Sequence, residues 1–246
     1  MPQSYSPVYF PQDWSPISMS ASNQVEDTCT DDANNNIGNY CTLNSVATVA
    51  SNMTFANGNL TVNAGTPGND DGGLCTIAVD PEDSDGWYYE WKLDTSDNGR
   101  HMGFCTLPQD VDLLGRTNRT GQYGLYSLGS GSQWATVING TETGTGVSYG
   151  TGSVMFALKN GKLYMGYNGS WLGSANPATE SNPQVTGLSG PMVPYFGFNS
   201  GTGSNTITAN FGQSDFAHTP PTGYKRINTA NLPAPTVTKP DDFFNT

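Results

Sequence analysis

Two Asn-Gly pairs punctuate the segment that most constrains how this chain folds. Residues 151–171 read TGSVMFALKNGKLYMGYNGSW, and apolar residues alternate on both sides of Asn160-Gly161. Asn and Gly tolerate the positive φ angles that a two-residue hairpin turn requires. The pattern therefore predicts an antiparallel hairpin whose second strand ends at Asn168-Gly169. The other strands of the chain must pair with this hairpin or pack against it.

The rest of the chain is divided in a similar way. It contains 30 Gly and 16 Pro residues, and no stretch repeats apolar residues at helical spacing. Many short strands with Gly and Pro turns indicate an all-β sandwich or barrel. The hydrophobic content of 35% is low, but 12 Tyr, 10 Phe and 5 Trp residues each bury a large area. Further strands are expected at residues 59–64, 75–79, 87–93, 101–105, 123–127, 192–198 and 206–211.

Two of these segments carry more specific predictions. Every second residue from Trp87 to Leu93 is apolar and is expected in the core, while Tyr88, Glu90 and Lys92 share the other face of a half-buried strand. Pro194 cannot donate a hydrogen bond to a neighbouring strand, so its strand is expected at a sheet edge or at a bulge. The chain between these strands supplies loops, expected at residues 65–73 and 173–190.

Charge and hydropathy exclude two classes of partner. The formal net charge is −12 and the sequence pI is about 4.2, with nine scattered Lys and Arg residues. Nucleic-acid binding needs a concentrated basic surface, so no nucleic acid is expected as a partner. No apolar run approaches the ~20 residues that span a bilayer, so we expect no membrane insertion. The first residues have neither a basic segment nor an apolar core, so no signal peptide is expected.

Motifs for catalysis, metal binding and cofactor binding are scarce. The chain has two histidines, His101 and His218, and it has no HExxH motif, P-loop or G-x-S-x-G elbow after a strand. Residues 27–36 are acidic and polar, but their spacing matches no calcium loop. The carboxylates of residues 82–97 lie mostly in turns, with Glu90 the exception. We therefore expect no enzyme activity, no catalytic residues, no metal and no cofactor.

The cysteines are too widely spaced for a CxxC metal site or a dense disulfide scaffold. They are Cys29, Cys41, Cys75 and Cys105. Reduced, mostly buried thiols are expected, and a Cys29–Cys41 bridge stays open as the main exception.

The order of several short segments is typical of one domain family. A Gly-Trp-Tyr-Tyr-Glu strand at 86–90 is followed by Gly-Phe at 103–104 and Tyr-Gly-Leu-Tyr at 123–126. Gly-Ser-Val-Met-Phe-Ala-Leu then leads into the Asn-Gly-Lys-Leu-Tyr hairpin, which ends in Tyr-Asn-Gly-Ser-Trp. Over about residues 38–216 this order resembles the SPRY (B30.2-like) domain. The family's Asp before the central strand is absent, because Gly152-Ser153 stands there.

The resemblance implies a two-sheet antiparallel β-sandwich of the concanavalin-like jelly-roll type. It implies a binding or structural module without a catalytic site, in which Glu90 is a framework residue. Three strings look closer still to SPRY-like domains of bacteriophage and environmental viral structural proteins. They lie at residues 39–44, at 175–179 with 187–191, and at 208–213 with 220–224 and 228–233.

The closer resemblance implies a virion protein of a tailed phage, as a surface decoration, fibre or tail-adhesion component assembled in the host cytoplasm. Residues 37–218 are the expected sandwich, between a Pro- and aromatic-rich arm at 1–36 and a Pro-rich arm at 219–246. The arms are expected to dock on other virion proteins in a homo-oligomer or symmetric assembly. The alternatives are a carbohydrate-binding module for host-surface glycans and a peptide-binding SPRY adaptor.

SPRY-type domains bind through loops at one end of the sandwich, and loops on a rigid scaffold commonly carry recognition. Trp and Tyr rings stack on sugars or fill peptide pockets, and Arg donates bidentate hydrogen bonds. The alternative for Trp134 and Trp171 is that they cap the ends of the sandwich. The candidate ligand-binding residues are Arg100, Arg116, Arg119, Tyr126, Trp134 and Trp171.

Overall fold

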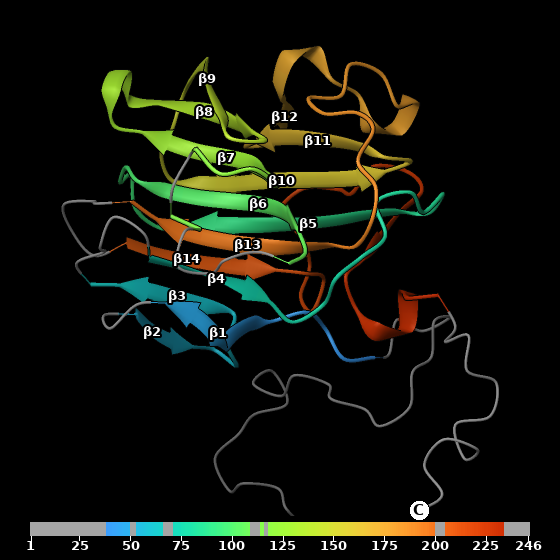
Figure 1. Cartoon of the computed structure of the whole chain (residues 1–246), viewed down its shortest axis with the longest axis horizontal. Helices are drawn as coiled ribbons and strands as arrows, with labels where there is room; N and C mark the ends of the chain where they lie inside the picture. Colours follow the sequence, from blue (N-terminus) through green and yellow to red (C-terminus); the bar gives the residue numbers. More distant parts are fainter. Residues whose placement is uncertain are drawn as a thin grey trace, which may run out of the picture.

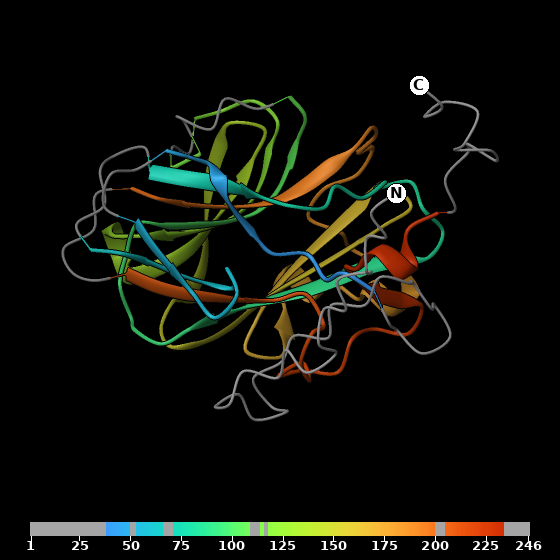
Figure 2. The same cartoon turned by 90° about the horizontal axis from the view of Figure 1, so that it is seen from below.

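The strands form two sheets that pack face to face, and Figure 2 shows the two layers one above the other. A two-sheet antiparallel β-sandwich is therefore confirmed as the fold class. No helix among the described residues is long and apolar enough to cross a bilayer. The computed structural model describes residues 38–49, 53–65, 71–108, 114–115, 118–199 and 205–233.

Both sheets span the height of the molecule in Figure 1, from β1 and β2 at the bottom to β9 and β12 at the top. The seven-stranded sheet has the order β1 (Leu43–Val49), β4 (Asp71–Cys75), β13 (Met192–Phe198), β6 (Arg100–Thr106), β7 (Gln122–Leu128), β8 (Gln133–Ile138) and β9 (Thr141–Ser148). The eight-stranded sheet has the order β12 (Ser170–Trp171), β11 (Lys162–Tyr167), β10 (Gly152–Lys159), β5 (Gly86–Leu93), β14 (Asn205–Asn210), β3 (Thr61–Ala64) and β2 (Met53–Ala56). Its eighth strand, β15 (Tyr224–Arg226), pairs with β5 in parallel.

The hairpin predicted from residues 151–171 is confirmed. β10 and β11 pair from Lys159↔Lys162 to Val154↔Tyr167, and β10 also pairs with β5. Both turn residues, Asn160 and Gly161, have positive φ angles of 49° and 69°. The side chains of the turn asparagines also cross-link the fold. Asn160 donates to Glu180, and Asn168 accepts from the Ser153 amide at 2.8 Å.

The core centres on Tyr89 in β5. Its ring stacks with Phe156 at 5.2 Å and with Phe211 at 5.4 Å between ring centroids, and it meets Phe104 of the opposite sheet edge-on. Its hydroxyl donates to the Gly103 carbonyl of the opposite sheet at 2.7 Å. The predicted inner face of this strand, including Trp87 and Leu93, is buried. One side chain therefore joins the two sheets by packing and by a hydrogen bond.

The outer face of β5 is only partly exposed, which corrects the prediction of a half-buried strand. Tyr88 and Glu90 are buried, and Lys92 alone is exposed on that face. The chain after β14 crosses over them. The Phe216 ring meets Tyr88 edge-on at 4.9 Å, and the Glu90 carboxylate accepts from the amides of Ala217 and His218 at 2.8 and 3.0 Å. Glu90 thus anchors this covering segment to the sheet.

The same covering chain corrects the expected boundary of the C-terminal arm. Residues 219–233 belong to the sandwich, because β15 pairs with β5 and Ile227 is fully buried in the core. Asn228 is also buried and bridges to Tyr40. The expected N-terminal arm and the remainder of the C-terminal one lie outside the described residues.

The strand boundaries around β4 also differ from the prediction. β4 begins at Asp71, inside the expected loop, and ends at Cys75, where the expected strand begins. Gly72 and Gly73 explain the difference, because β-carbons there would lie 2.7 Å from Leu114 and 2.4 Å from Thr48. The place of these two glycines in the sheet depends on neighbours that are distant in the sequence, so the local sequence pattern could not predict it.

Pro194 lies in an interior strand, since β13 runs between β4 and β6. The neighbouring chain is irregular there. Tyr195 pairs with Leu74 and Met192 with Val79, so four residues of that chain oppose two of β13. The missing donor of Pro194 therefore coincides with a bulge, which is one of the two predicted alternatives, and the edge position is wrong.

The three described cysteines are buried free thiols. Cys41 has no disulfide partner among the described residues, and the proposed partner Cys29 lies outside them. Burial raises the pKa of the Cys105 thiol well above its usual range, so this thiol stays protonated.

The hairpin turn gives a stability prediction with a matched control. Gly161 and Gly187 have nearly equal φ angles of 69° and 72°, but a β-carbon at Gly161 would lie 2.9 Å from the Leu188 carbonyl, whereas Gly187 faces open space. Gly187→Ala should lower the free energy of unfolding by about 1–2 kcal/mol, because alanine is strained in the left-handed backbone conformation. Gly161→Ala should lower the free energy of unfolding, measured by urea denaturation, distinctly more, because it adds the contact with Leu188. Equal decreases for the two variants would show that the turn is not packed as described.

Candidate binding site

The six sequence-predicted residues do not converge on one site. Arg100 begins β6 and is fully buried, with its guanidinium donating to the Thr95 carbonyl at 2.7 Å, to Asp97 at 3.0 Å and to the Thr95 hydroxyl. Burial lowers the pKa of Arg100, and Asp97 opposes this shift. Arg100 therefore holds the turn before its own strand and is not available to a ligand.

The remaining candidates are spread over the seven-stranded sheet and the far edge of the other sheet. Trp134 lies in β8, fully buried, with its ring edge-on to Tyr149 and Tyr167. Tyr126 lies in β7 and is half-buried, and Arg119 is half-buried in the loop before β7. Arg116 lies outside the described residues. Trp171 in β12 is the candidate that reaches a cavity.

His101 is buried in β6 beneath Tyr126, with ring centroids 4.2 Å apart. Neither of its ring nitrogens has a hydrogen-bond partner among the described residues. Burial lowers the pKa of His101 from its usual 6.5 to about 3. The imidazole is thus neutral at physiological pH and supports the sheet as a packed ring.

A cavity of about 330 Å³ lies between the β8–β9 hairpin of one sheet and the β11–β12 turn of the other. It has the size of a small-ligand pocket. Two aromatic rings, four hydroxyl groups (one of them phenolic) and one amide contribute to its lining, together with apolar groups. The residues are Thr136, Thr145, Tyr167, Ser170, Trp171 and Gln184.

One wall of this cavity is a bulge in β9. The β8–β9 register shifts between Gln133↔Ser148 and Ala135↔Gly144, which leaves residues 145–147 unpaired. The Thr145 hydroxyl donates to the Trp134 carbonyl at 2.7 Å, and the Gly146 amide donates to the Gln133 side chain at 2.7 Å. Two of the three bulge residues are therefore tied to β8 by hydrogen bonds.

The opposite wall is the chain that follows β11. Trp171 is half-buried and pairs with Gly166, where a β-carbon would lie 3.0 Å from the indole ring. The Gln184 side chain accepts from the Met165 amide and donates to the Leu172 carbonyl, both at 2.8 Å. Gln184 thus holds this wall in place, and both the oxygen and the nitrogen of its side-chain amide already make hydrogen bonds within the protein.

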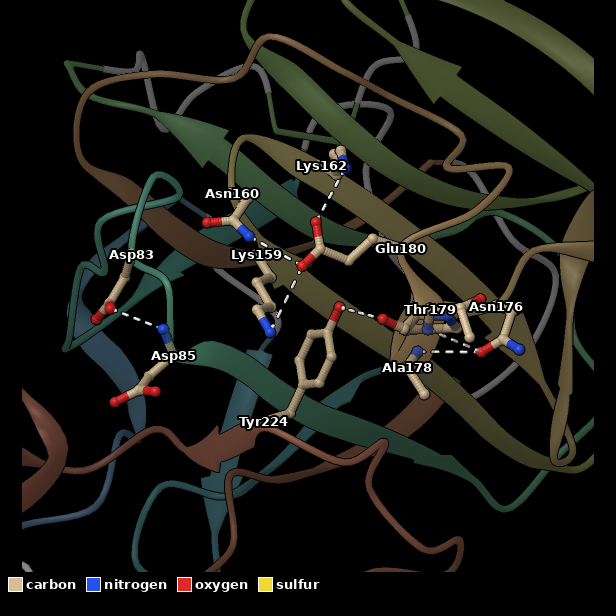
Figure 3. A network of polar contacts seen from close by, with 11 residues as sticks. Asp83, Asp85, Lys159, Asn160, Lys162, Asn176, Ala178, Thr179, Glu180 and Tyr224 are labelled. Carbon is tan, nitrogen blue, oxygen red and sulfur yellow. Dashed lines mark hydrogen bonds and ion pairs between the residues drawn. The ribbon is translucent and has the colours of Figure 1, made fainter.

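The loop behind this wall is held by the polar network of Figure 3. The Glu180 carboxylate contacts the ammonium groups of Lys162 at 2.9 Å and Lys159 at 3.5 Å, and the hydrogen bond from Lys162 lowers the pKa of Glu180. Asn176 caps the following 3-10 turn by accepting from Ala178 and Thr179. These contacts keep the long loop in one arrangement, so the cavity is preformed.

Two other hollows lie on the outer face of the eight-stranded sheet. One is a wide groove of about 1420 Å³ over Lys92, Ser153 and Thr208, and its described lining residues include no aromatic side chain. The other is a depression of about 490 Å³ between residues 215–220 and β15. Among the described residues, no group of three or more His, Cys, Asp or Glu could hold a metal ion.

Sequence reasoning missed most of this site. Thr145 and the bulge in β9 were not among the candidates, because β8 and β9 are absent from the predicted strands. A signal does exist there, since Asn139-Gly140 is a hairpin-turn pair and it joins β8 to β9. Tyr167 was predicted as a strand residue of the hairpin and not as a binding residue.

No protein-family model and no curated protein matches the chain. Solved structures do. The SPRY domain of human HERC1 is 14% identical, with 70% of this chain and 99% of that one covered at a TM-score of 0.50. The TRIM65 PSpry domain is 14% identical, with 69% and 89% covered at 0.47. Stonustoxin is 12% identical at 0.52, with 69% of this chain but only 28% of that chain covered.

The similarity to the HERC1 domain shows that the chain has a SPRY-like fold, as the order of its motifs predicts. At identities of 14% or less, similarity to a solved structure establishes the fold and says nothing about ligands or partners. The finer resemblance to viral structural proteins stays a prediction.

The buried histidine predicts a pH dependence of stability. Between pH 6.5 and about 3 the unfolded chain binds a proton at His101 that the folded chain does not bind. The free energy of unfolding should therefore fall on acidification, by about 1.4 kcal/mol per pH unit from this group. In urea titrations at several pH values, His101→Leu should show a shallower fall than the wild type. Parallel pH profiles would contradict the burial of His101.

Proposed function

We propose that this chain is a non-catalytic recognition domain that binds a saccharide in the cavity between the β9 bulge and Trp171. The observation that carries the proposal is the combination of two partly exposed rings, Tyr167 and Trp171, with the hydroxyl groups of Thr136, Thr145 and Ser170. Aromatic faces pack against the C–H face of a sugar ring, and hydroxyl groups exchange hydrogen bonds with those of the sugar.

The chemistry of the lining favours binding over hydrolysis. No carboxylate, imidazole, thiol or ammonium group occurs among the described residues that line this cavity. Glycoside hydrolysis ordinarily needs two carboxyl groups on either side of the scissile bond. Tyr167 is the one titratable group among the described lining residues. Burial raises its pKa, so its hydroxyl stays protonated; it donates to the Thr151 carbonyl at 2.9 Å and can accept from a ligand.

Preorganisation also favours a binding role. The bulge is tied to β8 by two hydrogen bonds of 2.7 Å, and the opposite wall is tied by Gln184 and the Glu180 network. A ligand would therefore meet a wall that is already ordered, which reduces the entropy lost on binding.

A glycan array followed by calorimetry tests this proposal. Trp171→Ala should remain folded, because the ring is half-buried at an edge strand, and should weaken binding of the strongest array ligand by at least about tenfold. Trp171→Phe keeps a ring and should retain part of the affinity. Trp134→Ala is the structural contrast, since loss of a buried ring should cost about 3–5 kcal/mol of stability. Absence of any glycan ligand, or unchanged binding by Trp171→Ala, would contradict the proposal.

A short peptide is the second candidate ligand, and the exposed edge of β9 favours it. Residues 141–144 precede Thr145 of the cavity wall and are exposed at the edge of the seven-stranded sheet, where an extended peptide could add as a further strand. A ligand found on peptide arrays but not on glycan arrays, and lost in Trp171→Ala, would select this alternative.

We also propose that the domain works on the surface of a phage particle, docked there through its terminal arms. The three strings that resemble viral structural proteins and the acidic, Gly- and Thr-rich composition support this setting. Mass spectrometry of purified particles should detect the chain, and immunogold labelling should place it on the particle surface. Recovery of the chain only in the particle-free fraction of the lysate would contradict a virion role.

A further inference from the structure

The depression beside β15 brings two cationic side chains and a histidine close to the turn before the proposed saccharide cavity. It measures about 490 Å³ and lies between residues 215–220 and β15. Lys225, Arg226 and His218 line it, with Asp215 as the one carboxylate among its described lining residues. Such a cluster is notable in a chain whose formal net charge is −12.

Arg226 differs from the other cationic residues around it. Every described lysine is paired with a carboxylate, and so is Arg100. The Arg226 guanidinium has no ion pair and no hydrogen bond with a described residue. Its partner is the Phe216 ring, 5.9 Å from the guanidinium carbon. No described residue therefore accepts a hydrogen bond from the Arg226 guanidinium.

The stem of Arg226 is held in place by packing. A β-carbon at Gly212 would lie 2.4 to 2.6 Å from three carbons of the Arg226 side chain, so this glycine makes room for the stem. The residue is half-buried, and its neighbour Lys225 is tied to Asp85 at 2.5 Å. A fixed guanidinium whose donors no described residue uses is the group best suited to a planar carboxylate.

The depression adjoins the turn that leads to the saccharide cavity. The His218 ring lies against Gly169, where a β-carbon would be 3.1 Å from its Nδ1 atom. A series of ring contacts also joins the two hollows. Trp171 meets Tyr88 at 6.4 Å, Tyr88 meets Phe216 at 4.9 Å, and Phe216 lies under Arg226. The two hollows thus lie on either side of one turn.

We propose that this depression is an anion subsite, in which Arg226 and His218 bind the carboxylate of an acidic saccharide whose neighbouring ring occupies the Trp171 cavity. The proposal rests on the proposed saccharide function and narrows its ligand to uronic-acid-type glycans. Arg226 supplies the charge and the paired donors, and His218 supplies a further N–H group at the side nearest the cavity.

Trigalacturonate and the neutral galactotriose of the same linkage are the matched probes, since they differ only in the carboxylates. Titration of the full chain followed by ¹⁵N NMR should show trigalacturonate shifting the amide signals of Gly169, His218 and Arg226. Galactotriose should shift signals around Trp171 and leave that of Arg226 unchanged. The wild type should bind trigalacturonate at least about tenfold more tightly than galactotriose.

Arg226→Gln should remove this preference by weakening trigalacturonate binding about tenfold while leaving galactotriose binding unchanged. Arg226→Lys keeps the charge and the stem packing and should retain part of the preference. Lys92→Gln is the matched control, because it removes one positive charge from an exposed position of the same sheet face, in the wide groove. Thermal melts establish that each variant is folded.

The outcomes separate the two proposals. Equal affinities for the two trisaccharides, or equal effects of Arg226→Gln and Lys92→Gln, would overturn the anion subsite. If Trp171→Ala loses galactotriose binding in the same experiments, the proposed saccharide function is still supported although the anion subsite is not. Tighter binding of a hexaglutamate peptide than of trigalacturonate would overturn the assignment to a saccharide.

Discussion

Burial of β5 on both faces is the constraint on which the rest of this structure depends. On the inner face, Tyr89 packs between Phe156 and Phe211 and donates to the Gly103 carbonyl of the opposite sheet. On the outer face, Glu90 accepts from two amides of the covering chain, and its two oxygens are thereby satisfied. A buried carboxylate without such donors would be costly, so the covering segment and the strand stabilise each other.

This arrangement also places the proposed recognition surface. Tyr88 points outward from β5 and contacts both Trp171 and Phe216, so one buried ring supports the saccharide cavity and the cationic depression. The hairpin of β10 and β11 pairs with β5 and brings the turn before Trp171 to the same edge. Recognition by this domain would therefore use rigid strand ends and short turns, with little ordering on binding.

The sequence alone predicts the features whose causes are local. The hairpin follows from Asn160-Gly161, and the inner face of β5 follows from its alternating aromatic residues. The burial of Glu90 could not be predicted, because its partners lie 127 and 128 residues away. The candidate site was predicted only at Trp171. Residue type suggested exposed roles for Arg100 and Trp134, but tertiary packing buries both.

A crystal structure of the chain with trigalacturonate tests the central claim most directly, since that claim concerns where a ligand lies relative to β5. The account predicts a sugar ring against Trp171 and Tyr167, with a carboxylate within hydrogen-bond distance of the Arg226 guanidinium. A ligand bound instead in the wide groove over Lys92 and Thr208, with both hollows beside Tyr88 unchanged, would contradict it.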